Sequence, residues 1–85
     1  MDPTRQKIRD ILSVRLKFST AVAAWGDDDP LFGPNGLGLD SIDALELVLG
    51  LQREFGVTIE DREIAVKVLA TINSIAEFVQ SQGKG

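Results

Sequence analysis

The sequence predicts a small all-α bundle of three main helices and one short helix, with a long loop between the first two main helices. Apolar residues recur at spacings of three and four along three segments, as in amphipathic helices. Residues that favour helix starts, such as aspartate and threonine, precede those segments. A chain of 85 residues has room for one domain, which we expect over residues 1–80, followed by a flexible tail at 81–85.

The composition argues against several classes of function. The chain contains no cysteine and no histidine, so we expect no disulfide, no histidine-dependent catalysis and no metal site. No apolar run approaches the length of a membrane span and no signal-peptide core is evident, so the expected compartment is the cytoplasm, without membrane insertion. The net charge of −4 and the pI of about 4.6 argue against a nucleic-acid partner and favour partners with basic surfaces.

The first helix is expected from Pro3 to about Lys17. Asp2 can cap it, and proline suits the first helical position because an N–H there would have no partner. The apolar residues at helical spacing in this segment are Ile8, Ile11 and Leu12.

Residues 19–39 form a long connection rich in glycine, proline and aspartate, which is typical of turns. Its apolar residues are too many for a freely solvated loop, so we expect them to pin it over the bundle as a hydrophobic lid. They are Trp25, Leu31, Phe32, Leu37 and Leu39. The alternative for the tryptophan is a contact with a partner protein.

Two motifs within this loop lack essential parts. The run Asp27–Asp29 suggests calcium, but Pro30 and Leu31 stand where an EF-hand loop needs further oxygen ligands and its glycine. The glycine cluster at 33–38 is not followed by the Lys-Ser or Lys-Thr pair of a phosphate-binding loop. Both are better interpreted as turn-forming, solvated sequence.

The second main helix is expected from Asp40 to Phe55. Either Asp40 or Ser41 can cap it, and the simplest interpretation of the serine is an N-cap. Gly50 lies opposite the apolar face, so core packing does not explain it; it either admits a partner backbone or has no role. Gly56 suits the end of the helix. The residues of the core-facing side are Ala44, Leu47, Val48, Leu51 and Phe55.

The last two helices are short. Asp61 can cap a helix over residues 62–68, although Ile64, Val66 and Val68 alternate as in a strand. We predict a helix because an isolated strand would have no pairing partner in so short a chain. Thr71 then caps the last helix, whose expected inward residues are Ile72, Ile75, Ala76 and Val79.

The other side of the second helix carries an apolar strip, here called the outer strip, formed by Ile42, Leu45 and Leu49. Three acidic residues border it, namely Asp40, Asp43 and Glu46. Such a strip would fit an apolar socket with a basic rim on a partner. The alternative is that Leu45 completes the core and that the acids are solvated charges; the pattern leaves both open for Leu45.

The segment Gly38-Leu-Asp-Ser-Ile-Asp-Ala-Leu-Glu-Leu resembles the modification motif of acyl carrier proteins, in which Asp-Ser-Leu or Asp-Ser-Ile opens an acidic amphipathic helix. The segments 54–61 and 71–79 resemble later parts of the same family, so the resemblance covers about residues 31–79. It implies that Ser41, flanked by Asp40, Ile42 and Asp43, carries a 4′-phosphopantetheine arm from coenzyme A. Arg53 departs from the usually more acidic helix.

The resemblance implies a monomeric carrier, not an enzyme, that moves acyl thioesters between enzymes of fatty acid, polyketide or specialised lipid synthesis. The implied partners are a Mg²⁺-dependent phosphopantetheinyl transferase and acyl-transferring and ketosynthase-type enzymes with basic docking surfaces. The expected contact residues are Asp40, Ile42, Asp43, Leu45, Glu46 and Leu49. The Pro/Gly-rich approach to Ser41 and the modest acidity favour a specialised member over a housekeeping one.

Two details of the carrier reading depend on structure. A phosphate on Ser41 would meet the positive end of the helix and its free amides. An acyl chain would enter the bundle interior, although the residues concerned are needed for folding in any case; they are Leu47, Val48, Leu51, Phe55, Ile59, Ile64 and Ile75. The alternatives to an acyl carrier are a peptidyl or aminoacyl carrier of a nonribosomal or D-alanyl system, and an interaction module that is never modified.

Overall fold

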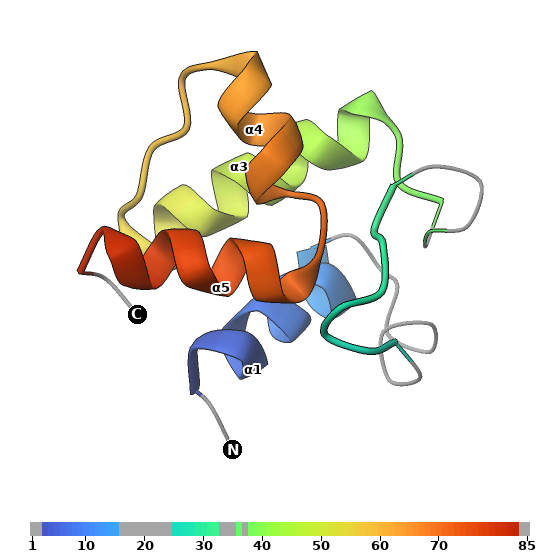
Figure 1. The fold of residues 1–85 in the computed structure, drawn as a ribbon, viewed down its shortest axis with the longest axis horizontal. Helices are drawn as coiled ribbons and strands as arrows, with labels where there is room; N and C mark the ends of the chain where they lie inside the picture. The colour runs from blue at the N-terminus through green and yellow to red at the C-terminus, as the bar shows by residue number, and fades with distance from the viewer. Residues whose placement is uncertain (1–2, 16–24, 33–35, 37, 84–85) are drawn as a thin grey trace.

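The computed structural model describes residues 3–15, 25–32, 36 and 38–83. Its helices are α1 (Pro3–Asp10), the π-helical turn η1 (Ile11–Arg15), α3 (Ser41–Phe55), α4 (Arg62–Val68) and α5 (Ile72–Ser81). In Figure 1, α3 and α5 run in the same direction across the view, α1 lies below α5, and α4 stands above them. The predicted all-α bundle is confirmed, and the short helix over 62–68 is present with Asp61 as its N-cap.

The first helix differs from the prediction in its geometry. It begins at Pro3 as expected, but α-helical geometry ends at Asp10 and a π-helical turn follows to Arg15. The proposed cap Asp2 and the expected end at Lys17 lie outside the described residues. The three apolar residues expected to face inward, Ile8, Ile11 and Leu12, are all buried.

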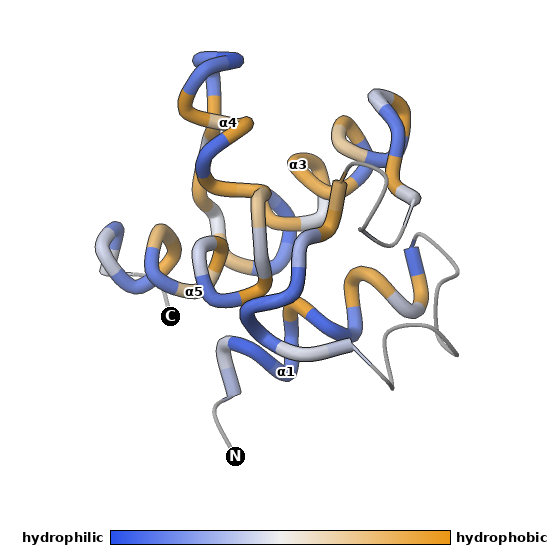
Figure 2. Tube along the Cα trace, turned by 45° about the vertical axis from the view of Figure 1, so that its right-hand side comes forward, coloured by the Kyte–Doolittle hydropathy of each residue, from blue (hydrophilic) through white to orange (hydrophobic). Residues whose placement is uncertain are grey.

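The core lies where these helices meet. Its fully buried side chains come from α1, η1, the loop, α3 and α5 and include Ile8, Leu12, Leu31, Leu47, Leu51, Ile72, Ile75 and Val79. In Figure 2 the hydrophobic segments of the trace alternate with hydrophilic ones along each helix, as expected for amphipathic elements. All four inward residues predicted for the last helix are buried, and Thr71 caps it through a bond from the Ser74 amide.

The loop before α3 is fixed to the bundle by apolar and polar contacts. Leu31 and Leu39 are buried, Trp25 and Phe32 pack against the core, and Phe32 pairs with Leu39 in an isolated bridge. The indole N–H of Trp25 donates to the Pro30 carbonyl oxygen at 3.0 Å. These contacts agree with the predicted lid for the described residues, whereas Leu37 lies outside them.

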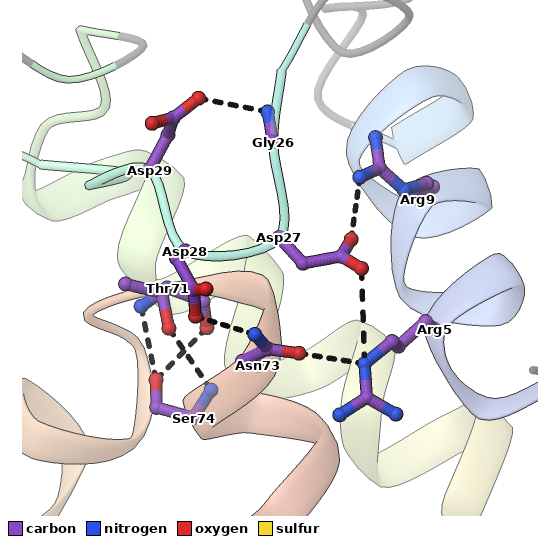
Figure 3. A network of polar contacts seen from close by, with 9 residues as sticks. All are labelled: Arg5, Arg9, Gly26, Asp27, Asp28, Asp29, Thr71, Asn73 and Ser74. Atoms are coloured by element: carbon purple, nitrogen blue, oxygen red, sulfur yellow. Dashed lines mark hydrogen bonds and ion pairs between the residues drawn. The ribbon is translucent and has the colours of Figure 1, made fainter.

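A polar network joins the same loop to α1 and α5 (Figure 3). Arg9 donates to the Asp27 carboxylate at 2.5 Å, and Arg5 Nε donates to Asn73 Oδ1 at 2.7 Å. The Asn73 side-chain amide donates to Asp28. The three aspartates therefore turn to different partners, since Asp29 accepts from the Gly26 amide. This arrangement agrees with a turn and not with a calcium loop.

Gly50 corrects the sequence interpretation. It is buried, not on an open side of the helix. A Cβ atom at this position would lie 2.7 Å from Ile11 Cγ2 and 3.2 Å from Arg15 Cδ. The sequence interpretation assigned only one side of α3 to packing. In the structure η1 packs against a second side, and it can approach closely there because glycine has no Cβ atom.

Candidate functional site

Ser41 is the first residue of α3 and is exposed. The N-cap is Asp40, whose extended backbone (φ −112°, ψ −171°) precedes the helix. The interpretation of the serine as the cap is therefore wrong. Its hydroxyl makes no hydrogen bond with the part of the chain that the structure describes, so it is available for chemistry at the start of the helix.

Two carboxylates on either side of the serine hold the helix start in a capping box. Asp40 Oδ1 accepts from the amides of Ile42 and Asp43, at 2.9 and 3.0 Å. Asp43 Oδ2 accepts in return from the Asp40 amide at 3.1 Å. The expectation that a phosphate on Ser41 would meet free amides is thus partly wrong, because two of these amides already have acceptors. The positive end of the helix dipole remains as a favourable environment for an anion.

A groove opens beside Ser41 between α3, α4 and the loop, with a volume of about 1000 Å³. It is lined mainly by apolar side chains, with charged groups at Asp40, Glu60, Asp61 and Arg62. Its apolar lining comprises Pro30, Phe32, Leu39, Ala44, Leu45, Val48, Ile59, Ala65, Val66, Leu69 and Ala70. Because Ser41 belongs to the same lining, a group attached to its hydroxyl can reach this groove.

The residues predicted to enclose an acyl chain are only partly brought together. Val48 and Ile59 line the groove. Ile64 does not, and its predicted place in the interior is wrong because it is 47% exposed. The cause is that α4 buries its end, at Val68 and Leu69, and not its beginning. The remaining predicted residues lie in the packed core, namely Leu47, Leu51, Phe55 and Ile75.

In the segment of α4 the sequence interpretation chose Ile64 for the pocket and missed the residues that line the groove there, namely Ala65, Val66 and Leu69. Ala65 and Leu69 line it and are four residues apart, a spacing that places both on one side of a helix. This spacing can be recognised in the sequence and indicates a shared apolar side. Of the alternating residues Ile64, Val66 and Val68, only Val66 belongs to the lining of the groove.

The outer strip is exposed. Ile42 is 71% exposed, Leu45 60% and Leu49 40%, so Leu45 does not complete the core. Asp40 is exposed at one end of the strip, whereas Asp43 and Glu46 are half-buried. Glu46 also forms an ion pair with Arg15 of η1, at 3.2 Å between Oε2 and Nη1. Within the described ranges no cluster of acidic side chains could hold a metal ion, and no helix is long and apolar enough to cross a bilayer.

The fold and the site define a class of small helical domain that presents an exposed serine at a helix start beside an apolar groove. A family model described as "Phosphopantetheine attachment site" matches residues 6–79. The chain belongs to this family, that of the acyl carrier proteins, which are carriers and not enzymes and whose prosthetic group is 4′-phosphopantetheine.

The curated relatives agree with this assignment. Chloroplastic acyl carrier protein 2 of Hordeum vulgare is 32% identical over 81 residues, which cover 92% of this chain and 56% of the relative. Chloroplastic acyl carrier protein 1 of Spinacia oleracea is 28% identical over 78 residues, covering 92% and 52%. Chloroplastic acyl carrier protein 5 of Arabidopsis thaliana is 41% identical over 44 residues, covering 52% and 30%. The chain therefore spans about half the length of the relatives that it matches most fully. No solved structure matches the chain significantly.

Proposed function

We propose that this chain carries acyl groups as thioesters on a 4′-phosphopantetheine arm joined to the Ser41 hydroxyl. The observation that carries the proposal is the position of Ser41, exposed as the first residue of α3 and shared with the lining of the apolar groove. When bound, the arm supplies a terminal thiol for the thioester. The residues fit it, because the hydroxyl is accessible and an apolar groove lies within the reach of a flexible chain.

The neighbouring carboxylates support a passive role for the carrier in its own modification. Asp40 accepts bonds from the amides of Ile42 and Asp43, and Asp43 accepts one from the Asp40 amide; within the described residues neither carboxylate accepts a bond from the Ser41 hydroxyl. Activation of the hydroxyl therefore belongs to a phosphopantetheinyl transferase that binds the carrier. The capping box fixes the orientation of the first turn and so presents the serine in one geometry.

The groove and the outer strip serve two further tasks, and Leu45 belongs to both surfaces. We assign the shelter of an acyl chain to the groove between α3 and α4, with Val48, Ile59 and Ala65 among its walls. We assign partner contacts to the outer strip together with Asp40, Asp43 and Glu46. Exposed apolar side chains in a patch bordered by charge are typical of a docking surface.

The pathway is a narrower proposal. We propose fatty acid, polyketide or specialised lipid synthesis, and a dedicated carrier over a housekeeping one. The apolar lining of the groove favours a hydrocarbon cargo over an aminoacyl or peptidyl cargo. The monomeric state, the basic docking surfaces of partner enzymes and the cytoplasmic location stay predictions; the relatives that match carry chloroplastic names.

The test is the intact mass of the full chain after incubation with coenzyme A, Mg²⁺ and a transferase of broad specificity. We expect a gain of one phosphopantetheine in the wild type and none in Ser41→Ala. Ser81→Ala is the matched control, because Ser81 is also exposed and lies in another helix, so it should be modified like the wild type. A folded wild-type chain that gains no mass would instead support the interaction module.

A further inference from the structure

Glu46 differs from the other acids beside the outer strip because it has a cationic partner. Its Oε2 lies 3.2 Å from Nη1 of Arg15, which belongs to η1. The side chains are 41% and 30% exposed, so the pair lies at the surface and a docking protein would meet both charges together. Asp40 and Asp43, in contrast, accept bonds from backbone amides and have no ion pair within the described residues.

The geometry that brings Arg15 to Glu46 depends on Gly50. The arginine Cδ and Nε lie 3.2 Å from the position that a Cβ at residue 50 would occupy. The side chain of Arg15 therefore passes directly over α3 at the glycine. Glu46 lies four residues earlier on the same helix, one turn away and on the same side. Gly50 thus has a role at the edge of the docking surface as well as in packing.

An ion pair at this place changes what a basic partner can gain from Glu46. Each cation of a partner that approaches the carboxylate must share it with Arg15 or displace the guanidinium. The attraction of the exposed charge for a distant basic surface is also reduced, because two opposite charges 3.2 Å apart largely cancel at distances well beyond their own separation. Binding then depends more on the apolar strip and less on charge.

We propose that Arg15 is a specificity-determining residue of the docking surface, which masks Glu46 and weakens recognition by partners with strongly basic rims. The proposal rests on the proposed carrier function. It makes this chain select partners whose sockets match the outer strip in shape and apolar character, with fewer cations opposite Glu46. Arg15 acts through Glu46 and is in this sense a positioning residue.

The experiment measures kcat/KM for transfer by one phosphopantetheinyl transferase with a basic docking surface, over a range of salt concentrations. Arg15→Met removes the charge but keeps an apolar stem against Gly50. We expect kcat/KM to rise about threefold at low salt and to fall more steeply with added salt. Lys67→Gln is the control, because it changes the net charge equally on an exposed part of α4, and we expect a smaller change.

A double-mutant cycle separates masking from a general charge effect. Glu46→Gln should lower kcat/KM less in the wild type than in the Arg15→Met background, where it should abolish the gain. An equal effect of Glu46→Gln in both backgrounds overturns the proposal, as does an equal effect of Lys67→Gln and Arg15→Met. Arg15→Gln serves as a second variant if the methionine variant does not fold. A wild-type chain that is never modified overturns the carrier function itself, and the role of Arg15 with it.

Discussion

The backbone amide of Asn73 donates a hydrogen bond to the carbonyl oxygen of Asp27 at 2.9 Å, which joins the first turn of α5 to the loop that leads to α3. The Asn73 side chain reinforces the connection through Arg5 and Asp28. A second backbone bond, from the Leu31 amide to the Ala70 carbonyl at 2.9 Å, lies close by in the sequence. The loop is therefore held by main-chain bonds at two places, and the side chains add to them.

Replacement of Asn73 by alanine tests the side-chain part of this connection. The variant keeps the backbone bond to Asp27 but loses the bonds to Arg5 and Asp28. We expect the free energy of unfolding to fall by about 1–2 kcal/mol, measured by urea denaturation. Gln80→Ala, at an exposed position of the same helix, should change it by less than about 0.5 kcal/mol. Equal effects of the two substitutions would contradict a structural role for the network.

Gly50→Ala tests the close approach of η1 to α3. Alanine favours a helix over glycine by about 1 kcal/mol, but its Cβ would meet Ile11 Cγ2 at 2.7 Å. We expect a net loss of about 1–3 kcal/mol in the free energy of unfolding, because overpacking outweighs propensity. Combination with Ile11→Ala should cost less than the sum of the single changes. A stabilised Gly50→Ala variant would show that η1 yields easily.

Two substitutions at Asp40 separate capping from charge. Asp40→Ala removes the acceptor for the amides of Ile42 and Asp43, and we expect a loss of about 1 kcal/mol. Asp40→Asn keeps a side-chain oxygen in the same place and should lose only a few tenths of a kcal/mol, since asparagine caps nearly as well. Thermal and urea unfolding measure both. If asparagine were as harmful as alanine, the charge would matter more than the hydrogen bonds.

The groove predicts a further effect in the acylated carrier. Ala65 lines the groove and is half-buried, so Ala65→Leu should reduce the space for a medium-length acyl chain. We expect acylation to raise the Tm of the wild type more than that of Ala65→Leu. The two rises should differ by about 4–8 °C for each kcal/mol of stabilisation that the variant loses. Gln52→Leu adds comparable bulk at an exposed position of α3 outside the groove and should behave as the wild type. An equal rise in Tm on acylation of the wild type and both variants would show that the acyl chain lies outside this groove.

The starts of α3, α4 and α5 and the end of α3 could be predicted from the sequence because their causes are local. Asp61 and Thr71 accept bonds from amides two or three residues later, and Gly56 adopts the left-handed conformation (φ 73°) that ends α3. The exposed serine could be predicted from the resemblance. Which of Asp40 and Ser41 caps the helix could be decided only from the geometry of the structure.

The remaining features depend on contacts between segments distant in sequence. Burial of Gly50 follows from the packing of η1, and Ile64 is exposed because the seven-residue helix α4 buries only its last residue, Val68. The partner of Glu46 lies 31 positions earlier in the chain, in a turn whose π-helical geometry is not predicted by the spacing of apolar residues. Spacing within one helix carries no information on such pairings.

The three sides of α3 have a consequence for how this chain can vary. One side is closed by the core at Leu47 and Leu51, and a second is closed by η1 at Gly50, so substitutions there should lower the free energy of unfolding. The third side, with Ile42 and Leu45, touches little within the described chain. Mutational tolerance should therefore be high on that side whenever folding alone is selected. Divergence among related carriers can then alter the choice of partners while the bundle that supports the serine stays the same.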